Sequence, residues 1–347
     1  MPVIFVGKVN SPDDVKYLES EYSADYIAVG RALVADSEFI GKIEGKVKGL
    51  FRPCLECSQG CLGGVKRGKG LQCLVDPTVG KIEPRQVEAE GAKSFAVVGG
   101  GLSGMEAAVS LREKGYNVDL YEMGELGGQF VLASLTPNKQ SMGRLIPYYT
   151  AKLSNSGVRL IKSEAKPEDL LSGYDSVVLA TGAKDSIPSI PGLVNYRTSD
   201  ILLDSELPTG KKVLIIGGGL TGVDIATALI TRNNQVIIVK RTTDFGQDME
   251  MISKKLSLKM MKEKNVVFSD YTRIKKIEGS TVYALRNEED ITFSDIDLII
   301  VSTGMKSNNP LQEVLENKVP VYVIGDADKI GDAQDAIADA YFTAAGL

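Results

Sequence analysis

Histidine is absent from this sequence of 347 residues. Without an imidazole the chain has no Ser-His-Asp or Cys-His nucleophilic set, no histidine-ligated zinc and no imidazole acid/base step. Long apolar runs are also lacking, since none approaches the ~20 residues needed to cross a bilayer. The N-terminal run Met1–Val6 is short and has no basic leader, which is not typical of a signal peptide. From these absences we expect a cytoplasmic protein with no membrane partner.

An excess of positive charge is lacking as well. The 40 Lys and Arg residues are outnumbered by 45 Asp and Glu residues, giving a formal net charge of −5. A nucleic-acid-binding face needs a strong basic excess, so this balance argues against a nucleic acid partner. With 43% hydrophobic and 24% charged residues, the composition is that of a globular protein with room for two or three domains.

Glycine is plentiful, with 36 residues, and it gathers in repeated strand–glycine–helix units. This pattern predicts an α/β fold with mostly parallel sheets. The N-terminal part reads as two short strands, 3–6 and 26–29, around a helix 12–22, followed by a helix and linker 31–48. The first glycine unit reads as strand 95–98, turn 99–104, helix 105–114 and strand 118–122. The second reads as strand 213–216, turn 217–222, helix 223–231 and strand 236–239.

The first glycine turn carries the pattern Gly99-x-Gly101-x-x-Gly104, and Glu122 closes the next strand. Glycines permit a tight turn and a close approach of the backbone to a pyrophosphate at a helix N-terminus. An acid at the end of the second strand accepts hydrogen bonds from ribose hydroxyls. The turn follows a strand and opens a helix, so the motif predicts a dinucleotide site.

The second turn repeats the pattern as Gly217-x-Gly219-x-x-Gly222, beginning 118 residues after the first. Its following strand ends in Lys240 and Arg241, where the first copy has an acid. Cations at this place can bind an adenosine 2′-phosphate, which favours NADPH as the cofactor. The alternative is that Lys240 and Arg241 are solvated surface charges and that the cofactor is NADH. A spacing of this length is too long for a solenoid repeat and indicates two dinucleotide-binding folds.

The four cysteines are spaced Cys-x2-Cys-x3-Cys-x11-Cys, at Cys54, Cys57, Cys61 and Cys73. Four thiolates on a loop rich in Gly and Lys can hold zinc or a [4Fe–4S] cluster. Disulfides are not expected in a cytoplasmic chain. Zinc ribbons usually pair two compact Cys-x2-Cys knuckles, whereas this spacing bunches three ligands and returns with one. Because two redox nucleotide sites are expected in the same chain, we favour the electron-carrying [4Fe–4S] cluster over zinc. All four cysteines are then ligands, so none remains to form a redox disulfide.

Two such folds in one chain resemble the flavoprotein superfamily with two dinucleotide-binding domains, FAD on the first and NAD(P)H on the second. Residues 179–183 and 301–304 are similar to the junctions between the two domains in that superfamily. Gly182, in the first junction, is therefore expected to be a cofactor-binding residue. The resemblance implies a discontinuous FAD domain, 93–206 and 307–347, around an NAD(P)H domain, 207–306. It also implies FAD contacts for two further pairs of residues. They are Gly128 and Gln129 in the 127–129 motif, and Gly325 and Asp326 in the 323–327 motif, where the aspartate meets the ribityl chain.

Three features follow one another along the chain: the segment Val29–Asp36, the four cysteines and the two dinucleotide-binding folds. A chain with these features in this order resembles a narrower group of flavoenzymes. This group is the iron–sulfur flavoenzymes related to 2,4-dienoyl-CoA reductase, trimethylamine dehydrogenase and 2-enoate reductase, and the chain is similar to its C-terminal portion. The resemblance implies that residues 1–50 are the last two βα units of a partial TIM barrel and that 51–92 hold the cluster. Gly30 and Arg31 match positions that bind the FMN phosphate, so FMN is expected only if the barrel is completed.

The resemblance implies a route from NAD(P)H to FAD, then by single electrons through a [4Fe–4S] cluster, and in the intact family to FMN and an enoyl or enoate substrate. No side chain is expected to act as a catalytic acid or base. Several forms remain open: a fragment, a subunit of a split enzyme with a complementary chain, or a free-standing reductase with a stub. A non-catalytic assembly subunit, or a relative of the glutamate synthase small subunit with structural zinc, also fits the pattern.

Overall fold

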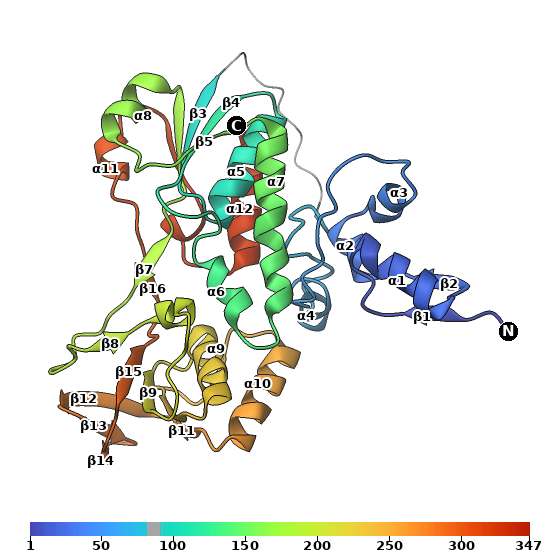
Figure 1. Cartoon of the computed structure of the whole chain (residues 1–347). Coiled ribbons are helices and arrows are strands. Elements are labelled where there is room, and N and C mark those ends of the chain that lie inside the picture. The colour runs from blue at the N-terminus through green and yellow to red at the C-terminus, as the bar shows by residue number, and fades with distance from the viewer. Residues whose placement is uncertain (82–90, 92) are drawn as a thin grey trace. The chain divides into compact units, whose positions relative to one another are not determined.

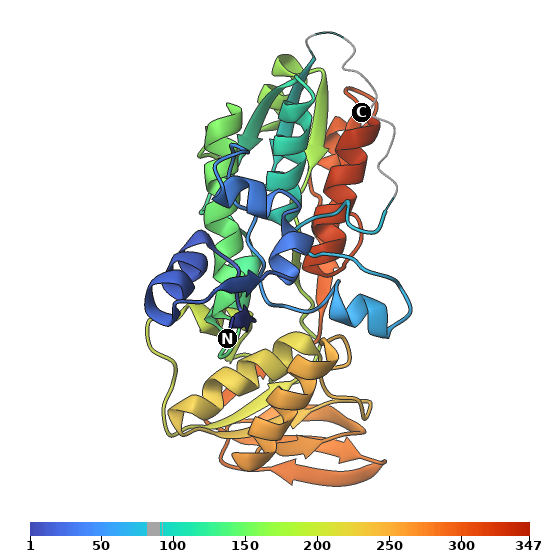
Figure 2. The same cartoon turned by 90° about the vertical axis from the view of Figure 1, so that its right-hand side faces the viewer.

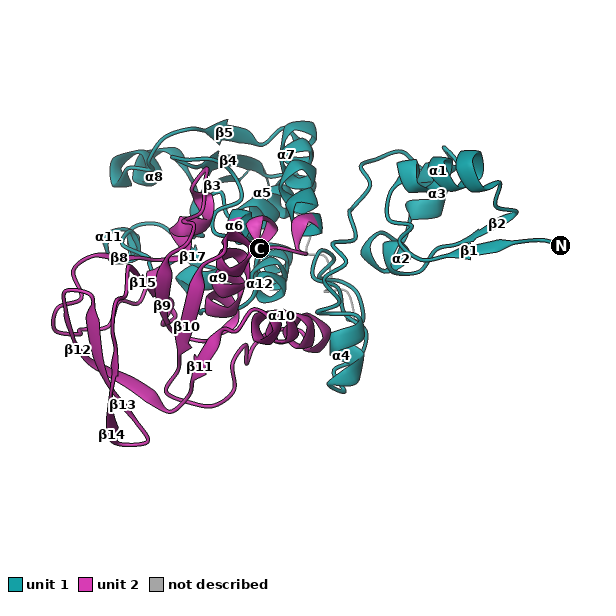
Figure 3. Ribbon diagram, turned by 60° about the horizontal axis from the view of Figure 1, so that its bottom comes forward, with its two compact units in different colours: residues 1–131, 141–183, 307–347 teal, residues 132–140, 184–306 magenta. Residues whose placement is uncertain are grey.

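The computed structural model describes residues 1–81, 91 and 93–347, and these form two compact units (Figure 3). Unit 1 comprises residues 1–131, 141–183 and 307–347, and unit 2 comprises residues 132–140 and 184–306. Residues 82–90 and 92, which fall in the predicted cluster segment 51–92, lie outside the described residues. The α/β class with parallel sheets, predicted from the glycine units, is confirmed.

Unit 1 contains a five-stranded sheet in the order β17-β6-β3-β4-β5, and every neighbouring pair is parallel. The inner strands at residues 94–98 and 176–179 read as nearly continuous apolar runs because helices cover both faces of the sheet. The strands are β3 (Ser94–Val98), β4 (Asn117–Tyr121), β5 (Arg159–Ile161), β6 (Ser176–Leu179) and β17 (Val321–Val323).

Helices α5 (Leu102–Glu113), α7 (Leu145–Ser156) and α12 (Ala333–Gly346) run alongside one another over this sheet (Figures 1 and 2). On the other face, α8 (Pro167–Gly173) and α11 (Gln312–Leu315) contribute Leu170 and Leu315 to a core with Val98 and Leu179. The result is a three-layer arrangement, helices–sheet–helices, with the glycine turn at the carboxyl end of β3.

The N-terminal part of unit 1 is a small βα assembly (Figure 1). Strands β1 (Ile4–Val6) and β2 (Tyr26–Ala28) pair in parallel, and α1 (Pro12–Tyr22) connects them. Ser11 caps α1 by accepting a hydrogen bond from the Asp14 N–H group. Two short helices, α2 (Arg31–Ala35) and α3 (Phe39–Ile43), lie where one helix and a linker are predicted, and α4 (Leu62–Lys66) follows in the cysteine loop.

Unit 2 contains a second five-stranded parallel sheet, in the order β11-β10-β9-β15-β8. Helices α9 (Leu220–Leu229) and α10 (Met251–Glu263) cover one face. The antiparallel meander of β12 (Thr272–Glu278), β13 (Thr281–Arg286) and β14 (Glu289–Phe293) packs its apolar side on the other. The strands of the sheet are β8 (Tyr196–Arg197), β9 (Lys212–Ile216), β10 (Gln235–Val239), β11 (Val267–Ser269) and β15 (Leu298–Val301).

Both glycine-motif helices begin earlier than the sequence predicts. Helix α5 starts at Leu102 rather than 105, and α9 at Leu220 rather than 223, so the third glycine of each motif lies inside the helix. The cause is that this glycine is needed for close packing of the first helical turn, as shown below, and does not break the helix. The remaining elements are α6 (Phe130–Leu135), η1 (Gln140–Arg144), β7 (Ala183–Asp185), η2 (Ser199–Leu203), η3 (Ile230–Arg232), β16 (Met305–Ser307) and η4 (Gly325–Ala327).

In the part of the chain that the structure describes, the helices are too short or too polar to traverse a lipid bilayer.

Candidate functional site

The first glycine turn is shaped by glycines that have no room for a side chain. Gly99 has a φ of +109°, and a Cβ on it would lie 2.3 Å from the carbonyl oxygen of Ala180. A Cβ on Gly104 would lie only 1.8 Å from the carbonyl oxygen of Gly99. At Gly101, the N-cap of α5, a Cβ would meet no protein atom within 4 Å. The turn is therefore tightly packed against the sheet and open at Gly101, which suits the approach of a pyrophosphate.

Glu122, at the end of β4, is tied to this turn. Its carboxylate accepts hydrogen bonds from the N–H groups of Gly100, at 2.6 Å, and Gly124, at 2.7 Å. The Gly127 N–H group in turn donates to the carbonyl oxygen of Gly100, at 2.8 Å. A carboxylate offers about four acceptor sites, so these two bonds leave Glu122 able to accept from ribose hydroxyls as well.

The predicted motif at residues 127–129 lies against the same turn. Gly128 has a φ of +53°, and a Cβ on it would lie 3.2 Å from the Cα of Gly101. The side-chain amide of Gln129 donates to the carbonyl oxygen of Ala183, at 2.8 Å. Gly182, the neighbouring residue, has a φ of +68°. The structure thus brings Gly128 next to the glycine turn and Gln129 next to the segment that carries Gly182.

The late motif at Gly325 and Asp326 also reaches α5. Gly325 has a φ of +59°, and a Cβ on it would lie 2.5 Å from the Ser103 hydroxyl oxygen. Its N–H group donates to the carboxylate of Asp339, at 2.7 Å. Burial raises the pKa of Asp326, whose carboxylate accepts from the N–H group of Gly331 at 3.0 Å. Segments from three distant parts of the sequence therefore meet at the N-terminus of α5.

The second glycine turn repeats the geometry of the first. Gly217 has a φ of +116°, and a Cβ on it would lie 1.9 Å from the carbonyl oxygen of Ser302. A Cβ on Gly222 would lie 2.1 Å from the carbonyl oxygen of Gly217, whereas one on Gly219 would meet nothing within 4 Å. The same division into packed and open glycines marks unit 2 as a second dinucleotide-binding fold.

Lys240 and Arg241 follow β10, and their surroundings differ. The Lys240 ammonium donates to the carbonyl oxygen of Asp244, which holds it on the neighbouring loop. Arg241 is exposed, and its guanidinium makes no hydrogen bond or ion pair with the residues that the structure describes. Arg241 is therefore the cation of this pair that is available to an anionic group at the end of the strand.

Sequence reasoning missed a buried acid in each glycine-motif helix. Glu106 and Asp224 each stand two residues after the third glycine, and they are 6% and 5% exposed. Glu106 accepts hydrogen bonds from the hydroxyls of Tyr149, at 2.6 Å, and Ser110, at 3.0 Å. Both oxygens of Asp224 accept from the Lys139 ammonium, at 2.7 and 2.6 Å. Burial raises the pKa of Asp224, and the neighbouring Lys139 opposes this effect. The sequence signal that could have revealed these residues is the acid found two positions after the third glycine in both copies of the motif.

The four cysteines line one small cavity of about 20 Å³, and all four thiols are free. Burial raises the pKa of Cys54 and Cys73 and brings that of Cys57 to about 12. Apolar side chains lie among them, including those of Val34 and Leu74. In the described ranges, no three His, Cys, Asp or Glu side chains are placed to hold one metal ion. Four thiols, one buried and three half-buried, have the donor chemistry that a cationic metal group requires, because the metal favours the thiolate form.

Backbone N–H groups point at three of the four sulfurs. Two residues of this loop, Glu56 and Ser58, have left-handed backbone with φ of +57°, which wraps the chain around the cysteines. Hydrogen bonds to sulfur are one of the features that set the potential of iron–sulfur clusters. Together with the four thiols they make this loop a fitting holder for such a group. The donors are the N–H groups of Glu56 toward Cys54, Gln59 toward Cys57, and Val75 and Asp76 toward Cys73.

The cysteine loop is fastened to the same unit that carries the first glycine turn. The Ser141 hydroxyl, just before α7, donates to the carbonyl oxygen of Leu55 at 2.7 Å. The side-chain amide of Gln334, at the start of α12, donates to that of Gln72 at 3.0 Å. A Cβ on Gly60 would lie 2.6 Å from the amide oxygen of Gln334, so glycine is required for this close approach. Both contacts lie within unit 1.

Arg31, predicted from the resemblance to meet an FMN phosphate, lies beside the cysteine loop. Its guanidinium donates to the Ser58 hydroxyl at 3.3 Å, and its side chain lines the cysteine cavity. Gly30 is the N-cap of α2 and has no atom near the place of a Cβ. Strands β1 and β2 leave apolar side chains exposed, with Val6 at 72% and Tyr26 at 63%.

Residues 93–340, which contain both glycine turns, match the family described as pyridine nucleotide-disulphide oxidoreductase. The chain belongs to this family. Membership of this family implies FAD and NAD(P)H as cofactors. This family also explains the two folds, because each dinucleotide requires a glycine turn of its own.

Relatives of this family member are similar over its whole length. An NADH oxidase of Thermoanaerobacter brockii is 32% identical over 98% of the chain and 54% of its own length. A cinnamate reductase of Clostridium sporogenes is 30% identical, over 100% of the chain and 53% of its own length. The solved structure of a 2-naphthoyl-CoA reductase has a TM-score of 0.90 and 26% identity, over 100% of the chain and 54% of its own. The resemblance to the iron–sulfur flavoenzyme group is confirmed, and the chain spans about half the length of the relatives it matches.

Proposed function

We propose that the chain is an electron-input module that takes hydride from NAD(P)H onto FAD and passes single electrons to a [4Fe–4S] cluster. The flavin exchanges two electrons with the nicotinamide and one at a time with the cluster, and this chemistry belongs to the cofactors. One observation carries the proposal: four cysteines line a single cavity on a loop fastened to the unit that holds the first glycine turn.

The FAD residues of the proposal are those gathered at the N-terminus of α5. The open turn at Gly101 receives the pyrophosphate, and Glu122 accepts from the ribose of the adenosine. Asp326, near the start of α12, is proposed to meet the ribityl chain. The full set is Gly99, Gly101, Gly104, Glu122, Gly128, Gln129, Gly182, Gly325 and Asp326.

Unit 2 is proposed to bind the nicotinamide dinucleotide. The turn formed by Gly217, Gly219 and Gly222 takes the pyrophosphate, since its middle glycine is open as in the first copy. Lys240 and Arg241 are proposed to meet an adenosine 2′-phosphate, which favours NADPH over NADH.

Cys54, Cys57, Cys61 and Cys73 are the proposed ligands of the cluster. Their bunched spacing, the N–H groups aimed at the sulfurs and the cations around the cavity support this choice. Among those cations, Arg31 lines the cavity and Arg144 donates to the carbonyl oxygen of Cys54 at 3.4 Å. Positive charge beside four thiolates offsets the negative charge that a thiolate-bound cluster carries.

The activity of the complete relatives extends the proposal. The names of the two reductases refer to cinnamate and to 2-naphthoyl-CoA, which supports an enoate or acyl-CoA substrate for a protein of that length. We propose that Gly30 and Arg31 contribute to an FMN site when the two N-terminal βα units are joined to the rest of a barrel. A complementary chain is one source of that remainder. The isolated chain is expected to show no alkene reduction.

The test uses anaerobically purified protein, in which iron, acid-labile sulfide, zinc and released flavins are measured. We expect about four irons and FAD per chain, with visible absorbance that bleaches on addition of NAD(P)H. FAD and FMN together would show that another polypeptide completes the FMN site. Zinc without iron would contradict the proposal, because zinc is redox-silent. A C61S variant is expected to lose iron and keep FAD.

A further inference from the structure

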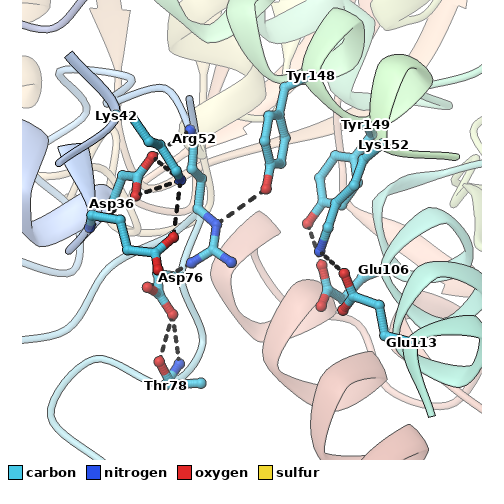
Figure 4. A network of polar contacts seen from close by, with 11 residues as sticks. Asp36, Lys42, Arg52, Asp76, Thr78, Glu106, Glu113, Tyr148, Tyr149 and Lys152 are labelled. Carbon is cyan, nitrogen blue, oxygen red and sulfur yellow. Dashed lines mark hydrogen bonds and ion pairs between the residues drawn. The ribbon is translucent and has the colours of Figure 1, made fainter. Parts of the chain in front are cut away.

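An ion pair joins the two ends of the loop that carries all four cysteines. Arg52 precedes Cys54 by two residues and Asp76 follows Cys73 by three. The Arg52 guanidinium lies 2.6 Å from the Asp76 carboxylate (Figure 4). Their side chains are 27% and 11% exposed, so the pair is well shielded from solvent. We call this contact the clasp.

Each residue of the clasp is itself held in place. The Asp76 carboxylate accepts from both the N–H group, at 3.0 Å, and the hydroxyl, at 2.7 Å, of Thr78. The Arg52 side chain donates to the hydroxyl of Tyr148, on α7, at 3.3 Å. The Arg52 N–H group donates to Asp36 at 3.0 Å, so the clasp also joins the N-terminal βα units to α7 (Figure 4).

The clasp also reaches a proposed ligand directly. The backbone N–H group of Asp76 lies beside the sulfur of Cys73. A shift of Asp76 would therefore move Cys73, the last proposed ligand. A shift of Arg52 would move the backbone that leads into Cys54, the first proposed ligand. Among the described residues, no other ion pair spans all four cysteines. Lys8 and Arg144 pair with Glu56, which lies inside the loop.

We propose that Arg52 and Asp76 are positioning residues that close the cysteine loop around its metal group and set the electrostatic surroundings of that group. This inference rests on the proposed function. Closing the loop reduces the chain entropy that the ligands lose when they converge. Removing one partner leaves the other charge poorly compensated in a shielded place, which opens the loop.

The first experiment measures metal retention. Wild type, R52A, D76A and the charge-exchanged double variant R52D/D76R are compared for iron and sulfide content and for the rate of iron loss to a chelator. R159A is the control, because it removes an ion pair between β4 and β5 of the same unit. We expect iron loss at least about tenfold faster in R52A and D76A, partial recovery in the double variant and wild-type behaviour in R159A. Bound FAD and the thermal unfolding temperature report on the general fold.

The second experiment separates charge from mechanical support. The midpoint potential of the metal group is measured in R52Q and D76N by redox titration with detection by electron paramagnetic resonance. Loss of the cation in R52Q is expected to lower the potential, and loss of the anion in D76N to raise it. If the ion pair only supported the loop mechanically, the midpoint potentials of R52Q and D76N would shift in the same direction, because each variant opens the same loop.

The outcomes distinguish the clasp from the function on which it rests. Iron in wild type with unchanged retention in R52A and D76A would overturn the clasp and leave the function standing. Equal loss of iron in R159A would also overturn it. Zinc in wild type would contradict the electron-transfer function, while faster zinc release from R52A would still support the clasp. A wild-type protein that binds no metal under anaerobic conditions would overturn both.

Discussion

Asp224 stands in the glycine-motif helix of unit 2 at the place that Glu106 holds in unit 1, 118 residues earlier in the chain. The two acids have different partners: hydroxyl groups for Glu106 and an ammonium group for Asp224. A buried carboxylate needs hydrogen bonds or an opposite charge. The repeated acid is therefore used in each unit to hold a different segment against the helix that follows the glycine turn.

Removing the ammonium is expected to destabilise unit 2. In K139M the Asp224 carboxylate stays buried without its ion-pair partner, and such a change costs ~3 kcal/mol or more. The free energy of unfolding, measured by denaturant titration at neutral pH, is expected to fall by about this amount.

The double variant K139M/D224N is the partner measurement for this prediction. It removes both charges and is expected to recover most of the lost free energy. K255M, on the exposed side of α10, serves as the control for loss of one lysine. A double variant no more stable than K139M alone would contradict this interpretation of the pair.

Alanine at the open glycines is expected to separate cofactor binding from folding. In G101A and G219A the new methyl group meets no protein atom within 4 Å, so both variants should fold. We expect G101A to lose FAD, and G219A to keep FAD with a KM for the nicotinamide cofactor raised about tenfold or more. Flavin content and steady-state kinetics with a one-electron acceptor measure the two effects.

The packed glycines provide the contrast. G104A and G222A place a Cβ within 1.8 and 2.1 Å of a carbonyl oxygen, so they should lower the yield of folded protein as well as cofactor binding. Full FAD binding by G101A would show that no pyrophosphate approaches Gly101.

The exposed cation after β10 is expected to select the cofactor. In R241A the KM for NADPH should rise several-fold while that for NADH stays unchanged, because only NADPH carries the 2′-phosphate. Parallel kinetics with both cofactors measure the ratio. Equal changes for the two cofactors would assign Arg241 to the solvated surface.

Asp119 is expected to make the fold sensitive to acid. Burial raises the pKa of Asp119, but its hydrogen bonds from Arg159 and Tyr174 outweigh this, and the net pKa is lowered. A lowered pKa contributes stability above the unfolded value of ~3.9, and this is lost as the pH falls through the folded pKa. D119N should therefore unfold at a lower temperature than wild type at pH 6, and the gap should close in strong acid. A gap that stays constant with pH would contradict this assignment.

The glycine turns were predictable because their requirements are local. Gly99 and Gly104 contact each other within one turn and the strand beside it, so the motif itself encodes the geometry. The grouping of the cysteines was predictable for the same reason, since three of them lie within eight residues. The helix starts were misplaced because Gly104 and Gly222 read as turn residues, although they serve packing inside the helix.

The contacts that join distant segments could not be predicted. Tyr148 meets Arg52 across almost a hundred residues, and Lys139 meets Asp224 across a similar distance in the sequence. No local sequence pattern predicts which of the 40 Lys and Arg residues will pair with a given buried acid. The place of Arg31 beside Ser58 likewise depends on how the N-terminal βα units pack on the loop.

The insertion of unit 2 between the parts of unit 1 has a consequence for biosynthesis. Strand β17 pairs with β6, and α12 packs on α5, yet both leave the ribosome after every residue of unit 2. Unit 2 is therefore able to fold while unit 1 still lacks an edge strand and a covering helix, since domains fold as units during synthesis. Gly325 and Asp326, the proposed ribityl contacts, also emerge after unit 2, so the proposed flavin site is completed only after unit 2 has been made. A chain that terminates before β17 is therefore expected to bind pyridine nucleotide without flavin.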